Sequence, residues 1–241
     1  ESYKIINLAR KVNNLEAVIP KKGARFHFEM PGSVQGWKVR ENKASGTLSI
    51  NNVSNFSEQG KRCLEISLKS SQSDYCNEIF VSTFMPEEIK NLSGQKKETF
   101  FWYNFLCSPI IYPGQKITAF VKGDANNRDE VHFNLFVRVY GQSDKISLIC
   151  SESYLISPDK SKEITWSPKV PNGNPIFEIG LRFGVGHSRK GKVFLDSVNI
   201  SGEAKTTFER PSHTPKFERG RAFDPPRAEM WRHSWVQAVD H

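Results

Sequence analysis

The sequence contains no apolar run long enough to span a bilayer and no N-terminal pattern of a secretory signal peptide. It also contains no dinucleotide fingerprint, no P-loop and no Gly-x-Ser-x-Gly elbow. Strand patterns do not alternate with helix patterns, and no internal repeat is visible. These absences argue against a membrane-spanning protein, a nucleotide-binding α/β enzyme, an α/β-hydrolase and a repeat protein.

Cysteine is scarce, and no two of the four cysteines have the close spacing of a zinc site. Cys63, Cys107 and Cys150 lie in apolar or alternating runs, while Cys76 does not. We therefore expect buried free thiols. A disulfide is the alternative, and the spacing alone does not distinguish the two.

Acidic residues are fewer than basic ones, 26 against 34, which gives a formal net charge of +8. The excess is scattered over loops and the ends of the chain, and no dense Lys/Arg block with interleaved aromatic residues occurs. The sequence therefore predicts no nucleic-acid partner. Hydrophobic residues make up 37% and Phe occurs 17 times, which indicates one good core and some unpacked length.

The residues that are present read as about ten short strands separated by Gly, Pro, Asn, Asp and Ser turns. The first strand is expected over 24–30, with Phe26, Phe28 and Met30 on one face. The others are expected over 47–50, 63–68, 79–84, 116–122, 131–140, 146–156, 163–166, 177–185 and 191–202. This pattern predicts an all-β fold, with two antiparallel sheets packed as a jelly-roll sandwich.

Composition changes along the chain predict three regions. Residues 1–23 are expected to form a linker or docking segment, 24–202 the β-sandwich domain, and 203–241 an extended tail leading to a further domain. The chain starts at Glu1 rather than Met, so either a leader was removed or the chain is an excised piece of a longer protein. We expect the excised piece, because residues 238–241 carry no ending signal.

One acidic residue stands out in the last predicted strand. Asp196 interrupts the apolar residues Val193, Leu195, Val198 and Ile200 in mid-strand, where Asp is a poor strand former. A carboxylate there needs a hydrogen-bond network, an ion partner or a metal ion.

Several short motifs, taken in order, resemble the galactose-binding-like jelly rolls of carbohydrate-binding modules. They are Phe28-Glu29, Gly36-Trp37, Pro-Gly-Gln-Lys-Ile-Thr-Ala-Phe-Val-Lys over 113–122, Trp166, and Val-Phe-Leu-Asp-Ser-Val over 193–198. The resemblance implies a non-catalytic module whose ligand is a carbohydrate. It also implies that Glu29 and Asp196 help to hold a structural Ca²⁺.

The calcium implication has a physical alternative. Calcium takes about six to eight oxygen ligands, so backbone carbonyls from nearby loops would have to join Glu29 and Asp196. One ion would then tie the first and last strands together. Alternatively, Asp196 pairs with an Arg or caps backbone amides.

A narrower resemblance concerns the end of the chain. The motifs Phe-Leu-Asp-Ser-Val over 194–198, Thr-Phe-Glu-Arg-Pro over 207–211, and the final twelve residues from Met230 carry it. They resemble the non-catalytic sandwich region that follows the catalytic domain in some long bacterial ADP-ribosylglycohydrolase-like proteins. This implies that any catalytic residues lie outside the chain.

The aromatic run over 100–106 supplies the candidate ligand-binding residues Trp102, Tyr103 and Asn104. Exposed Trp and Tyr rings stack on the apolar faces of sugar rings, and an amide takes the hydroxyls. In a strand, however, Trp102 and Tyr103 would face opposite sides. The alternative, which this alternation favours, places one set in the core and the other beneath a loop or partner domain.

The remaining candidates have structural interpretations. Trp37 and Trp166 are expected to pack in the core or at a sheet edge, and Asp124 to stabilise a solvated turn. The favoured function is a non-catalytic accessory module of a larger hydrolase, which binds carbohydrate or packs against neighbouring domains. A free-standing sugar-binding protein is the alternative, and a jelly-roll glycosidase or lyase is the least favoured.

Overall fold

Two antiparallel sheets make up the described part of the chain, as a computed structural model shows. The structure describes residues 21–40, 48–54, 56–69, 77–82, 110–140, 146–171, 174, 176–183 and 190–205. The predicted linker up to residue 20, the aromatic run over 100–106 and the tail from 206 lie outside these residues.

The first sheet, here called the β6 sheet, has the order β1-β4-β10-β6-β7, with β8 also paired to β6. Its strands are β1 (Lys38–Val39), β4 (Asn77–Ser82), β6 (Val131–Tyr140), β7 (Ile146–Cys150), β8 (Tyr154–Ile156) and β10 (Ile176–Phe183). The second, the β11 sheet, has the order β2-β3-β11-β5-β9. Its strands are β2 (Leu48–Ser54), β3 (Arg62–Leu68), β5 (Lys116–Gly123), β9 (Ser161–Trp166) and β11 (Gly191–Ser201).

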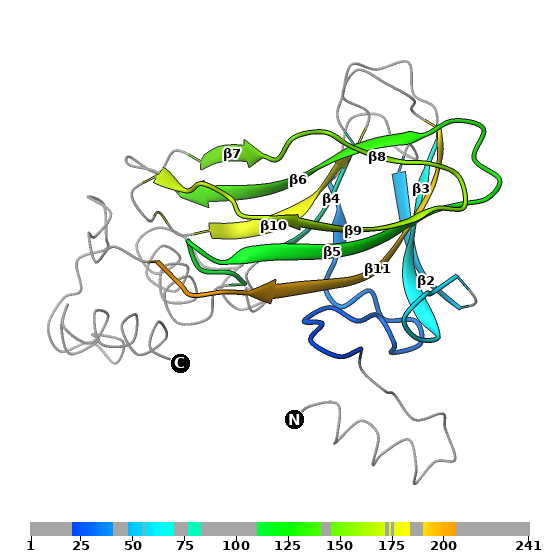
Figure 1. Cartoon of the computed structure of the whole chain (residues 1–241), viewed down its shortest axis with the longest axis horizontal. Helices are drawn as coiled ribbons and strands as arrows, with labels where there is room; N and C mark the ends of the chain where they lie inside the picture. The colour runs from blue at the N-terminus through cyan, green and yellow to red at the C-terminus, as the bar shows by residue number, and fades with distance from the viewer. Residues whose placement is uncertain are drawn as a thin grey trace, which may run out of the picture.

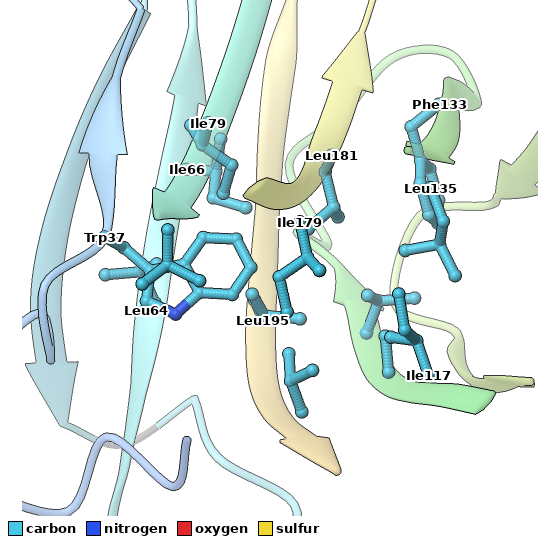
Figure 2. Close-up of a cluster of buried hydrophobic side chains, with 14 of the residues drawn as sticks. Trp37, Leu64, Ile66, Ile79, Ile117, Phe133, Leu135, Ile179, Leu181 and Leu195 are labelled. Carbon is cyan, nitrogen blue, oxygen red and sulfur yellow. The ribbon is translucent and has the colours of Figure 1, made fainter. Parts of the chain in front are cut away.

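Alternating apolar residues from both sheets form the core between them. In β6 every second side chain is at most 2% exposed: Val131, Phe133, Leu135, Val137 and Val139. Figure 2 shows Leu64, Leu195 and Ile117 of the β11 sheet meeting Ile79, Ile179 and Leu135 of the β6 sheet. The two-sheet all-β fold that the sequence predicts is therefore confirmed, because the alternation buries one face of each sheet.

The predicted strand over 146–156 is two strands separated by residues 151–153, and the side chain of Ser151 marks the break. The backbone of Ser151 donates to the Leu135 carbonyl, and the Ser151 hydroxyl accepts from the Leu135 amide in place of a backbone carbonyl. A side-chain oxygen thus replaces one backbone acceptor in the pairing with β6, so β7 ends at Cys150 and β8 begins at Tyr154.

The cysteine prediction is correct at one described position and wrong at another. Cys63 is a buried free thiol, and burial raises its pKa to about 12. Cys150 is also a free thiol but is exposed, since it lies opposite Phe136 on the outward side of the edge strand β7. Cys76 and Cys107 lie outside the described residues.

The predicted first strand over 24–30 is wrong. Only an isolated bridge between Phe26 and Val198 forms there. Phe28 has a φ of 56°, in the left-handed region, which ends any strand alternation. The Gln35 side chain accepts from the amides of His27 and Phe28, so these backbone groups are satisfied outside a sheet.

Asp196 occupies a β-bulge in β11. Leu195 pairs with Val121 of β5 and Ser197 pairs with Phe120, so Asp196 is an extra residue between two consecutive pairs. On its other side β11 also loses its partner strand at this point, because its pairing with β3 ends at Leu195. Figure 1 shows the consequence: β11 first follows β3, then bends to run along β5.

Burial predicts unequal effects for two matched substitutions. Leu195→Ala removes a side chain that is 0% exposed and should lower the free energy of unfolding by about 2–5 kcal/mol. Leu155→Ala removes one that is 42% exposed and should change it by less than about 1 kcal/mol. Urea denaturation of the two variants measures both, and equal losses would contradict this description of the core.

Candidate functional site

A lysine ammonium group lies between the two carboxylates that the sequence singled out. Lys21 Nζ is 2.7 Å from Asp196 Oδ1 and 3.3 Å from Glu29 Oε1. It also donates to the backbone carbonyls of Asp196 at 2.5 Å and of Arg62 at 2.7 Å. The three charged side chains are 2%, 1% and 5% exposed, in the order Lys21, Asp196, Glu29. We call these residues, with the Arg62 carbonyl, the Lys21 cluster.

Further hydrogen bonds reach both oxygen atoms of each carboxylate. Asp196 accepts from the Ser57 hydroxyl at 2.5 Å and from the Gln59 amide at 3.0 Å. Glu29 accepts from the amides of Lys61 and Arg62 at 3.1 Å. Asp196 therefore caps backbone amides, as the alternative interpretation expects, but its ion partner is a lysine rather than an arginine.

The residues present do not fit a metal ion beside Lys21. The ammonium group already occupies the point on which the four oxygen atoms converge. In addition, no group of three or more His, Cys, Asp or Glu side chains that could hold a metal occurs in the described residues. The structural Ca²⁺ that the sequence predicts at Glu29 and Asp196 would have to displace Lys21 Nζ to bind there.

Lys21 is the residue that sequence reasoning missed. It stands in the segment assigned to a linker, and nothing in a single lysine distinguishes a buried ammonium from a solvated one. Gly60 carries a related constraint. A Cβ there would overlap Glu29 Oε1 and lie 2.9 Å from Lys21 Cε, so any other residue would force these two buried side chains to shift.

His27 is buried next to the Lys21 cluster. Its Nδ1 accepts a hydrogen bond from the Glu29 amide at 3.1 Å, which requires that nitrogen to be unprotonated. Burial lowers the pKa of His27 below its ordinary value of 6.5, the charge of Glu29 raises it, and the charge of Lys21 lowers it.

A second cluster lies on the outward face of the β6 sheet. Glu78 of β4 and Glu178 of β10 both accept from Arg138 of β6, at 2.9 and 3.1 Å, and both accept from Arg40, at 2.7 and 2.5 Å. The two carboxylates are only 5% and 9% exposed. We call these four residues the charged network.

Aromatic rings support the charged network. The Arg40 guanidinium lies 4.2 Å from the centre of the Phe80 ring, and that of Arg138 lies 5.0 Å from the centre of the Phe136 ring. Phe136 is 0% exposed, and the opposite residue is Gly180, where a Cβ would lie 2.6 Å from the Phe136 ring. Buried charges on an outward sheet face carry a desolvation cost, so the charged network is a candidate functional site.

Other candidates take the places that their sequence contexts suggest. Trp37 is 2% exposed in the core, and Trp166 packs against the core from the edge strand β9. Asp124 accepts from the amide of Asn126 and so stabilises a turn, but its side chain is buried there rather than solvated as predicted. Trp102, Tyr103 and Asn104 lie outside the described residues.

Comparison with known proteins shows similarity at the level of the fold. No protein-family model matches the sequence, and no curated protein matches it either. Solved structures do match. The CBM22-1 xylan-binding domain of Xyn10C from Paenibacillus barcinonensis has a TM-score of 0.50 at 14% identity, over 73% of this chain and 90% of that one.

Two further structures extend the same similarity. A carbohydrate-binding module of the β-sandwich superfamily, studied for promiscuous specificity, has a TM-score of 0.52 at 14% identity, over 76% of this chain and 63% of that one. The CBM22-1–CBM22-2 tandem domain of the same Xyn10C has a TM-score of 0.50 at 14% identity, over 86% and 50%. At these identities the match shows the β-sandwich fold.

No helix with the length and apolarity to cross a membrane occurs among the described residues.

The environment of His27 predicts a loss of stability in mild acid. Because the folded-state pKa is lowered, the unfolded chain binds the proton more readily. The stability contributed by neutral His27 is therefore fully present above pH 6.5 and falls as the pH drops below it. Urea denaturation between pH 7.5 and pH 5.5 should show a larger loss for the native protein than for His27→Asn, whose Oδ1 can replace Nδ1 as acceptor. Equal losses would contradict the assignment.

Proposed function

We propose that this chain is a non-catalytic carbohydrate-binding module, and that its ligand binds on the outward face of the β6 sheet. The charged network is the observation that carries this proposal. The fold, similar to that of carbohydrate-binding modules, supports it.

The chemistry of the face suits sugar hydroxyl groups. Guanidinium groups present several N–H donors in one plane, and carboxylates present acceptors, so the two together can bind vicinal hydroxyls in a fixed orientation. The ion pairs within the network hold these groups in place before a ligand arrives, which lowers the entropic cost of binding. Arg40 is 32% exposed and Arg138 17%, so both guanidinium groups remain accessible from solvent.

The aromatic run would complete this site. Trp102 and Tyr103 follow β4 in the sequence, and β4 contributes Glu78 and Phe80 to the same face. We propose that one of these rings stacks on the ligand and that Asn104 hydrogen-bonds to it. Neither Glu78 nor Glu178 is proposed as a catalytic acid, because each is already engaged by two guanidinium groups.

The module would serve a larger hydrolase, and the resemblance of residues 230–241 to the sandwich region of ADP-ribosylglycohydrolase-like proteins supports that parent.

One observation favours packing against a neighbouring domain as the second candidate function. Three large apolar side chains lie exposed on the outward side of β7 and β8, at 52%, 37% and 42% exposure: Ile146, Leu148 and Leu155.

Affinity electrophoresis in gels containing soluble polysaccharides tests the proposal, with xylan, mixed-linkage β-glucan and galactan as the first probes. The protein should be retarded by at least one of them. Arg40→Ala and Trp102→Ala should each weaken binding by about tenfold or more, which corresponds to one lost good contact. Lys116→Ala, which removes an exposed charge from the β11 sheet, should leave binding unchanged.

Melting temperatures of the variants separate lost binding from lost folding. Equal mobility of the native protein in every gel, supported by an equally flat response on a glycan array, would overturn the proposal in favour of the packing function. Release of sugar or of an aryl alcohol from an aryl glycoside by the pure chain would overturn the proposal that the chain is non-catalytic.

A further inference from the structure

We propose that the ammonium group of Lys21 takes the place of a metal ion in the Lys21 cluster, and that its removal leaves a site for a divalent cation. This inference does not depend on the proposed carbohydrate-binding function. The Lys21 ammonium group would hold the bulge of β11 at the position where the sequence predicts a Ca²⁺.

The donors around Nζ are those that a hard cation prefers. Two carboxylates and two backbone carbonyls converge on one point, and all four ligand atoms are oxygen. Charge also matches, since the two buried carboxylates require positive charge close by. A small divalent cation and an ammonium group satisfy the same requirement.

The ammonium group leaves no donor unused. A lysine ammonium has three N–H donors, and three oxygen atoms lie within 2.7 Å of Nζ: the carbonyls of Arg62 and Asp196, and Asp196 Oδ1. Glu29 Oε1 adds an ion pair at 3.3 Å. The cluster is therefore complete without an added ion, because each hydrogen-bonding group on the cation has a partner.

The chain connectivity explains what this cation does. Lys21 contacts residues that are 41 and 175 positions away, and it lies before the first strand of either sheet. Lys21 therefore connects the N-terminal segment and the start of β3 to the bulge. Beyond the bulge β11 no longer pairs with β3, and Val198 forms the isolated bridge to Phe26 instead. A bound Ca²⁺ would make the same connection, but only while the ion was present.

Two substitutions separate the charge of Lys21 from its volume. Lys21→Ala removes both the ammonium and its carbon chain, which leaves the oxygen atoms facing a space that water and a cation can enter. Lys21→Met keeps most of the carbon chain and removes the charge, so the space stays filled. Both should lower the melting temperature, because each leaves buried carboxylates without a cation.

Scanning calorimetry in 5 mM CaCl₂ and in 5 mM EDTA tests the proposal. The melting temperature of the native protein should be the same in both. CaCl₂ should raise that of Lys21→Ala by several degrees over EDTA, because a ligand that binds only the folded state stabilises it. Lys21→Met should show no such rise.

Three results would overturn the proposal: a higher melting temperature of the native protein in CaCl₂, a Lys21→Ala variant as stable as the native protein, or a destabilised Lys21→Ala variant that CaCl₂ does not stabilise. If Lys21→Ala does not fold in EDTA, recovery of strand circular dichroism on adding CaCl₂ supports the proposal, and failure to recover counts against it. Titration calorimetry of the native protein with CaCl₂ should show no binding, and binding would restore the calcium site predicted from the sequence.

Discussion

The bulge at Asp196 is the constraint on which the rest of this sandwich depends. One extra residue in β11 lets the strand leave β3 and continue along β5, which gives the β11 sheet its bend. The extra residue carries a charge into a site where its side chain is 1% exposed, so the fold must supply a cation there. Lys21 supplies this cation, and the Ser57 hydroxyl and the Gln59 amide donate further hydrogen bonds to the Asp196 carboxylate. The N-terminal segment, the loop before β3 and the last strand are thus held at one point.

The sequence predicted the features that depend on local periodicity. The strict alternation of β6 and the apolar residues around Asp196 were sufficient to indicate a two-sheet sandwich, and they showed that this carboxylate needs a partner. Features that depend on distant pairs could not be predicted. The alternation around Phe28 looks like a strand, but the positive φ and the Gln35 side chain that accommodates it are tertiary in origin. Lys21 lies 175 residues from its partner, and no spacing rule connects the two.

The two sheets contribute differently to the proposed function. The bulge of the β11 sheet binds the internal cation, Lys21 of the N-terminal segment, while the β6 sheet carries buried charges on its outward face. The charged network could not be predicted from local patterns, since Glu78, Arg138 and Glu178 come from three separate strands. Strand register places Arg138 opposite Glu178 across β10 and β6, and the length of the Arg138 side chain lets its guanidinium also reach Glu78, whose own pairing partner is Arg182. The proposed carbohydrate ligand would bind to this face through its hydroxyl groups, and that role requires no catalytic residue.

A double-mutant cycle between Lys21 and Asp196 tests the central claim most directly, with the free energy of unfolding of the native protein, Lys21→Met, Asp196→Asn and the double variant as the measured quantities. If the ammonium and the carboxylate hold the bulge together, the cost of the double substitution will be smaller than the sum of the single costs by about 1–3 kcal/mol. Single costs that add to within about 0.5 kcal/mol would show that the two groups act independently, and would contradict the account.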